Sequence, residues 1–100
     1  MTDSNPLNLI SEAELNPVPV FNCIVILEKP DDKGCRTGRV ANLGGISSTG
    51  FSERDILTAI VKKFKASVQE YSANNQEIPW IEPPQKPSDG EVQRFIPVHL

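Results

Sequence analysis

One long stretch of helical periodicity constrains what this chain can fold into. From residue 52 to about residue 71, apolar side chains recur at steps of three and four, which places them on one side of a helix. They are Ile56, Leu57, Ile60, Val61, Phe64, Val68 and Tyr71. Ser52 precedes this run and Asp55 follows three residues later, a capping-box pattern at a helix start. A helix with a single apolar side predicts packing on a sheet.

The segment before this helix has the composition of β-strands and turns. β-Branched and aromatic residues dominate residues 18–28, and more polar strand patterns follow at residues 35–43 and 46–49. Short turns rich in proline or glycine connect them, so strands adjacent in sequence are expected to pair antiparallel. Gly38 lies inside the second strand, which suggests a β-bulge there.

The segment after the helix predicts an extended linker and one further strand. Residues 79–90 hold four prolines, which favour extended geometry. Trp80 and Ile81 are large apolar side chains within this linker, and we expect them to pack on the domain near the helix end. Residues 91–99 have a strand pattern, and Pro97 restricts it to a sheet edge. We expect this strand to join its own sheet beside the first strand; pairing with another subunit is the alternative.

Together these elements predict a two-layer α+β fold of order β-β-β-α-β, with one antiparallel sheet packed on a single helix. The predicted parts are a flexible N-terminal arm at residues 1–17, the main domain at 18–78, the linker at 79–90, and a C-terminal strand at 91–100 that completes the sheet. A chain of 100 residues that is 38% hydrophobic supports one modest core.

The first strand is apolar on both faces, which is unusual for an antiparallel sheet covered by one helix. One face carries Val20, Ile24 and Ile26, and the other carries Phe21, Cys23, Val25 and Leu27. One face takes the helix, and the other requires cover from the N-terminal arm, the C-terminal tail or a second chain. We predict that the second face, with Phe21, Cys23, Val25 and Leu27, is the exposed one and forms a protein interface.

Charge and cysteine content narrow the function classes. The net charge of −3 and the pI of about 5.0 argue against a free-standing nucleic-acid binder and suit a basic protein partner. Two cysteines without CxxC spacing predict free thiols in a reducing compartment. The sequence shows neither a secretory signal nor an apolar run of membrane-spanning length, so we predict a cytoplasmic protein.

Catalytic and metal-binding patterns are weak, so we expect a non-enzymatic protein without a cofactor. The single histidine, His99, lies next to the end of the sequence, where neither an orienting partner nor a protected site is expected. Asp31, Asp32 or Asp55 would serve a metal-dependent nuclease only if several carboxylates converged from different elements.

The predicted helix also carries a small basic face, made of Arg54, Lys62, Lys63 and Lys65. Such a face can contact the phosphates of RNA or DNA. Because no aromatic side chains are interleaved with it for base stacking, and because the chain is acidic overall, nucleic-acid binding is the weaker alternative.

The order of local motifs resembles the HicB-like antitoxin domain family. The resemblance rests on Arg39-Val40-Ala41-Asn42-Leu43-Gly44-Gly45-Ile46, then Gly50-Phe51-Ser52-Glu53, then the helix, then Gln76-Glu77-Ile78-Pro79. In that family a strand leads into a Leu-x-Gly turn, and a short polar strand, a capped amphipathic helix and a proline follow. The resemblance covers residues 20–79.

The resemblance implies a partial ribonuclease-H-like fold without nuclease activity. It also implies binding to a small basic, mRNA-cleaving toxin, whose active surface such domains mask, and self-association, which we expect here as a homodimer. Family members often continue into a C-terminal DNA-binding module, whereas this sequence has a proline-rich linker and one strand, which suggests a short, stand-alone member. An orphan homo-oligomeric domain of unknown role is the alternative.

Overall fold

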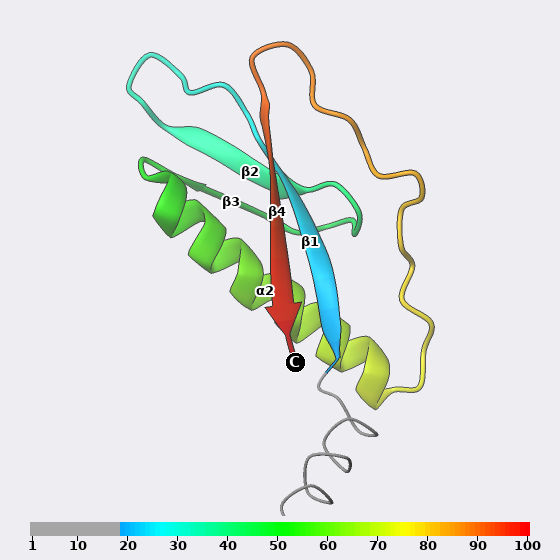
Figure 1. Cartoon of the computed structure of the whole chain (residues 1–100). Helices are drawn as coiled ribbons and strands as arrows, with labels where there is room; N and C mark the ends of the chain where they lie inside the picture. The colour runs from blue at the N-terminus through cyan, green and yellow to red at the C-terminus, as the bar shows by residue number, and fades with distance from the viewer. Residues whose placement is uncertain (1–18) are drawn as a thin grey trace, which may run out of the picture.

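This computed structural model describes residues 19–100, which fold into one antiparallel sheet and one helix (Figure 1). The elements are β1 (Val20–Leu27), β2 (Arg36–Val40), β3 (Ser47–Gly50), α2 (Glu53–Ala73) and β4 (Val92–His99). The strand order across the sheet is β3-β2-β1-β4, and every neighbouring pair is antiparallel. The α+β fold with β-β-β-α-β order is therefore confirmed. The predicted N-terminal arm lies outside the described residues.

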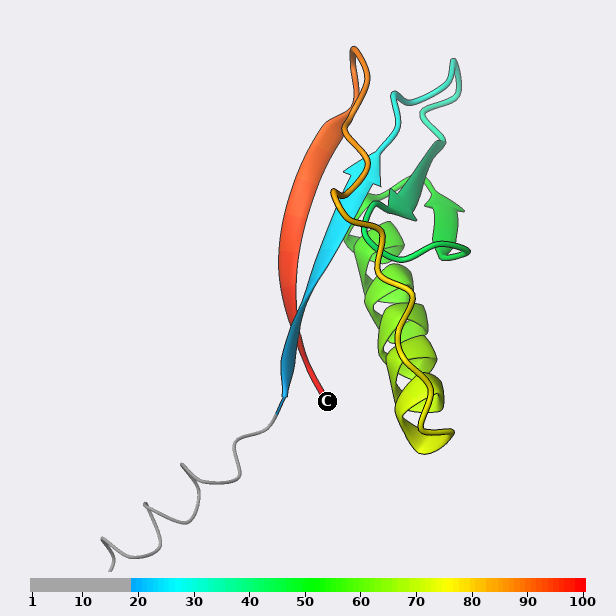
Figure 2. The same cartoon turned by 90° about the vertical axis from the view of Figure 1, so that its right-hand side faces the viewer.

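Helix α2 covers one face of the sheet and supplies four of the eleven residues of the buried core cluster (Figure 2). Four of its apolar side chains are fully buried: Ile56, Ile60, Phe64 and Val68. Burying a side chain of this size stabilises the fold by roughly 2 kcal/mol. The hydroxyl oxygen of Ser52 accepts the main-chain N–H of Asp55 at 3.4 Å, which caps the helix start as predicted. At the other end Asn75 adopts a left-handed conformation (φ 53°) that stops the helix.

The face of β1 that contacts α2 is the reverse of the predicted one. Cys23, Val25 and Leu27 have no exposed surface and belong to the core cluster with Phe64, while half-buried Phe21 packs against the same cluster. The prediction that these four residues form an exposed interface is wrong. Both faces of β1 are apolar, so the pattern of this strand alone does not say which face meets the helix.

Gly38 is the place where α2 approaches the sheet most closely. A β-carbon built on this glycine would lie 2.8 Å from Cγ2 of Ile56 and 2.9 Å from Cδ1 of Ile60, closer than carbon atoms pack. Gly38 pairs regularly with Leu27 on one side and with Ser48 on the other. The predicted bulge is therefore absent, and the glycine serves helix–sheet contact instead.

Strands β1 and β4 form a ribbon that extends beyond the rest of the sheet. They pair over all eight residues, whereas β2 pairs with only the last three residues of β1. Where β2 has ended, the side chain of Asn42 replaces it: Nδ2 donates to the carbonyl of Asn22 at 2.8 Å, and Oδ1 accepts the N–H of Ile24 at 3.2 Å. This one side chain satisfies two main-chain groups that would otherwise lack a strand partner.

The proline-rich linker is fastened to the domain rather than spaced away from it. Trp80 forms an isolated bridge with Leu43, and its ring lies 5.7 Å from that of Phe21 and 6.0 Å from that of Phe64. Trp80 therefore packs against the middle of α2 and not at its end. Farther along, the N–H of Gln85 donates to the carbonyl of Ala41 at 3.1 Å. The linker thus runs along the sheet before entering β4 (Figure 1).

Candidate protein-binding surface

The face of the sheet turned away from α2 carries an apolar groove between the linker and the β1–β4 ribbon. We call it the back groove; its volume is about 540 Å³, and it is lined by Ile24, Pro83, Pro84, Gln85, Lys86, Pro87, Gln93 and Phe95. Ile24 and Phe95 are cross-strand partners, so they lie side by side on this face. The three prolines have no main-chain N–H to present, which keeps that wall of the groove apolar.

Two apolar side chains on this face are exposed to solvent, Phe95 in the groove lining and Val20 farther along the ribbon. Phe95 is 65% exposed and Val20 is 51% exposed, and both lie on the same face as Ile24 because side chains alternate along a strand. Ile26, also on this face, is fully buried. The linker therefore covers part of the second apolar face of β1, and the remainder stays open to solvent.

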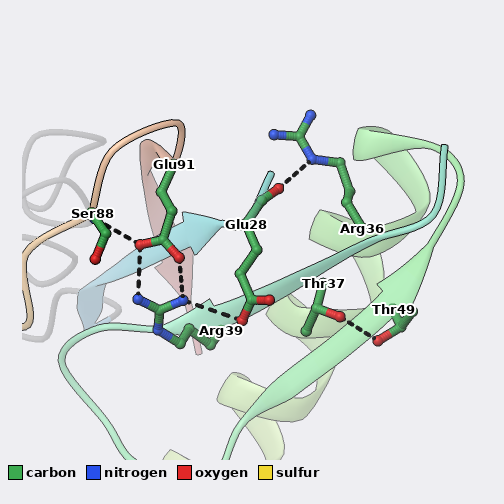
Figure 3. Close-up of polar contacts among 7 residues, drawn as sticks. All are labelled: Glu28, Arg36, Thr37, Arg39, Thr49, Ser88 and Glu91. Carbon is green, nitrogen blue, oxygen red and sulfur yellow. Dashed lines mark hydrogen bonds and ion pairs between the residues drawn. The ribbon is translucent and has the colours of Figure 1, made fainter. Parts of the chain in front are cut away.

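A charged cluster closes the end of this face where the linker meets β4 (Figure 3). The guanidinium of Arg39 donates two 3.0 Å hydrogen bonds to the carboxylate of Glu91 and one of 3.3 Å to Glu28. The N–H of Ser88 donates to the same Glu91 carboxylate at 2.8 Å. Because Arg39 belongs to β2 while Ser88 and Glu91 flank the start of β4, the cluster ties the end of the linker to the sheet.

The cluster makes the stability of this end depend on pH. Hydrogen bonds from Arg39 and Ser88 lower the pKa of Glu91 below its ordinary value of 4.5. A group with a lowered pKa contributes stability above its unfolded-state pKa and loses it as the pH falls through the folded-state pKa. We therefore expect Glu91→Gln to lower the urea midpoint of unfolding by roughly 0.3 M at pH 7, and the difference from wild type to shrink between pH 5 and pH 3.

The matched control for this prediction is Glu28→Gln. Glu28 makes one longer contact with Arg39 and is more exposed, at 44% against 14% for the side chain of Glu91. Its replacement should therefore change the midpoint less. An effect of Glu91→Gln that stays constant from pH 7 to pH 3 would contradict the role given to the carboxylate.

The predicted chemistry-bearing residues do not converge. No three His, Cys, Asp or Glu side chains among residues 19–100 are placed to hold a metal ion. Asp31 instead accepts the N–H groups of Lys33 and Cys35, both at 2.9 Å, within the β1–β2 turn. Asp55 lies in the first turn of α2, and His99 pairs across the ribbon with Val20.

The two cysteines are free thiols, as predicted. Burial raises the pKa of the Cys23 thiol to about 12, so it stays protonated and unreactive at neutral pH. Cys35 is half-buried in the β1–β2 turn. In the described residues, neither thiol is part of a cluster able to bind a metal.

The predicted basic face of α2 is divided. At 100° per residue, Arg54, Lys62 and Lys65 fall within about 80° of one another, whereas Lys63 points elsewhere. The ammonium group of Lys63 donates to the main-chain carbonyl of Ser47 in β3 at 2.7 Å. Lys63 also lines a second hollow of about 480 Å³, between α2 and the β2–β3 turn, together with Glu70.

The sequence contains a signal for the back groove but does not define it. Val20, Ile24 and Ile26 form an apolar set on one face of β1, and Phe95 alternates with Val92, Ile96 and Val98 along β4. The pattern does not indicate the path of the linker, which makes the second wall of the groove.

No family model, curated protein or solved structure matches the chain. Among residues 19–100, no helix has the length and apolar character needed to cross a bilayer.

Proposed function

We propose that this chain is a non-enzymatic protein-binding module of the HicB-like type, which neutralises a small basic, mRNA-cleaving toxin by covering it. The observation that carries this proposal is the back groove with exposed Phe95 and Val20 beside it. Contiguous apolar surface that stays open on a soluble domain marks a contact site for another molecule, and Ile24, Phe95 and the three prolines form such a surface. The element order also agrees with the fold that the resemblance implies.

A protein fits this surface better than a small molecule. The groove lies along a strand ribbon and Phe95 in its lining is 65% exposed, so it would not enclose a small molecule as small-molecule sites do. The linker carries exposed Glu82 and Asp89 on either side of its groove-lining run. These two carboxylates favour a partner that combines an apolar ridge with basic flanks.

The test uses a defined partner, the product of the open reading frame next to this gene, provided that it is a small basic protein. We expect its expression to arrest growth of a bacterial host through mRNA cleavage, and co-expression of the full chain to restore growth. Ile24→Lys places a charge on the groove floor and should weaken binding by roughly tenfold or more. Phe51→Ser, a change at an exposed residue of the β3–α2 connection, should bind as wild type.

Growth arrest that the full chain does not relieve, with no binding in calorimetry, would refute the toxin-neutralising role. Equal binding by wild type and Ile24→Lys would refute the back groove as the contact surface. RNA binding through Arg54, Lys62 and Lys65 is the alternative, and it predicts salt-sensitive binding of RNA by the chain alone.

A further inference from the structure

The open part of the back face runs from the groove to Val20, the first residue of β1, and the N-terminal arm (residues 1–17) joins the chain just before that residue. We propose that the arm folds back over the ribbon and occupies the back groove of its own chain, as a built-in competitor that a partner protein must displace. This proposal rests on the back groove as the contact surface of the proposed function, whatever partner that surface binds.

The groove lies within easy reach of the arm. Ile24 is four residues along β1 from Val20, which is roughly 13 Å in a strand. The N–H of Leu100 donates to the carbonyl of Pro19 at 3.2 Å, so the chain is tied to the end of β4 up to that residue and must reverse before it. Asn16-Pro17 favours a turn at that place. The residues before Pro17 span up to roughly 50 Å when extended, several times the distance to the groove.

The sequence of the arm has the pattern of an extended segment with one apolar side. One alternating set holds Leu7, Leu9, Ala13 and Leu15, and the other holds Asn8, Glu12, Glu14 and Asn16. Only Ser11 and Ile10 depart from this alternation. A period of two gives one side to an apolar surface and the other to water, which is what a segment lying on the back face requires.

The spacing of the arm matches the spacing of the exposed apolar side chains. Leu9 and Ala13 are four residues apart, as are Ile24 and Val20. A reversal within residues 14–18 therefore seats Leu9 on the pair formed by Ile24 and Phe95, and Ala13 beside Val20. Phe95 and Val20, which are 65% and 51% exposed on this face, would both be covered.

Charge favours the arm as an occupant but also makes it displaceable. Lys86 is the one charged side chain among the described residues that line the groove, and the arm has three acidic residues and no Lys or Arg. Glu82 and Asp89 lie on either side of the lining run of the linker, and an acidic arm leaves both unpaired. A partner with basic flanks pairs with them as well, so it replaces the arm.

The tether compensates for a weak contact. A short flexible connection gives the arm a local concentration on the order of millimolar at the groove. An arm whose free peptide binds with a dissociation constant on the order of 1 mM therefore occupies the groove in a large share of the molecules. A partner that binds more tightly than this still enters, at a reduced apparent affinity.

The test is paramagnetic broadening of amide NMR signals in the full chain. A nitroxide is attached to Asn8→Cys in a Cys35→Ser background, because Asn8 belongs to the polar side of the arm and does not take part in the contact. Buried Cys23 has a pKa of about 12 and does not react with the label.

We expect the amide signals of Ile24 and Phe95 to lose most of their intensity, while that of Lys62, on the side of α2 away from the sheet, keeps most of its own. Full intensity at Ile24 and Phe95 would overturn the proposal. A second sample mixes nitroxide-bearing chain without isotope label with isotope-labelled chain without nitroxide. Broadening in that sample would place the arm of one copy on another copy and would overturn the contact within one chain.

Two matched variants test which side of the arm makes the contact. Leu9→Ser should restore the intensity of the Phe95 amide, whereas Ile10→Ser removes a side chain of the same size from the opposite side and should leave the broadening unchanged. Neither residue belongs to the core cluster, so both variants should fold as wild type. Broadening that survives Leu9→Ser, or that Ile10→Ser removes, would overturn the proposed contact.

The competitor role has its own measurement once the growth test has supplied a partner. Leu9→Ser should lower the dissociation constant of that partner roughly fivefold, because the arm no longer competes, and Ile10→Ser should leave it unchanged. An unchanged dissociation constant for Leu9→Ser would overturn the competition. Because the nitroxide measurement uses the chain alone, failure of the toxin-neutralising role leaves it unaffected, and absence of the arm from the groove leaves the toxin test standing.

Discussion

The Gly38→Val chain should unfold at a much lower urea concentration than wild type, with a loss of roughly 3 kcal/mol in the free energy of unfolding. Valine adds three carbons where a single β-carbon would already lie 2.8 Å from Ile56 and 2.9 Å from Ile60. A third neighbour, Cδ2 of Leu27, lies 3.2 Å away, so the new atoms have no free direction. Helix α2 must move off the sheet, and it carries four of the eleven residues of the core cluster.

Alanine at the same position separates the steric clash of an added β-carbon from the general effect of replacing a glycine. Gly38→Ala should cost about 1–2 kcal/mol, and Ile60→Val, which deletes the Cδ1 atom 2.9 Å from the new β-carbon, should recover part of that loss in a double-mutant cycle. The control is Gly44→Ala, because a β-carbon on Gly44 meets only Cδ1 of Ile81 at 4.0 Å. If Gly38→Ala were as mild as Gly44→Ala, close helix–sheet contact would not be the reason for this glycine.

The fold could be predicted from the sequence because its signals are local. The period of α2, the cap at Ser52 and the stop at Asn75 each depend on residues within a turn or two. Strand β1 is rich in β-branched residues, and glycine or proline marks its turns. Strand β2 ended earlier than predicted, at Val40, because the side chain of Asn42 takes over the pairing with β1.

The candidate surface could not be predicted, because it depends on contacts between distant segments. Both faces of β1 are apolar, and the choice between them is made in β2, where Gly38 admits the helix on one side only. The cover of the other face comes from the linker, whose prolines indicate extended chain but not its path. Phe95 becomes part of a surface only when β4 pairs with β1, some 70 residues earlier in the chain.

Trp80 belongs to the linker and packs on the core. Trp80→Ala should therefore lower the free energy of unfolding by about 3 kcal/mol. Its ring packs against Phe21 from β1 and Phe64 from α2 and closes the space between the two layers. Trp80→Phe keeps an aromatic ring in that place and should cost less, about 1 kcal/mol. The measurement is urea unfolding of both variants beside wild type.

The same substitution should release the linker even where the domain stays folded. The N–H of Ile81, the residue after Trp80, donates to the carbonyl of Asn42 at 3.0 Å, and that of Gln85, farther along the linker, donates to the carbonyl of Ala41 at 3.1 Å. In Trp80→Ala these two amides should exchange with solvent faster than those in the middle of α2, and proteases should cut between residues 81 and 90. Because the linker forms one wall of the back groove, binding there should weaken together with this protection. If the variant lost stability while both amides stayed protected, the linker would be held by its own hydrogen bonds, and Trp80 would serve the core alone.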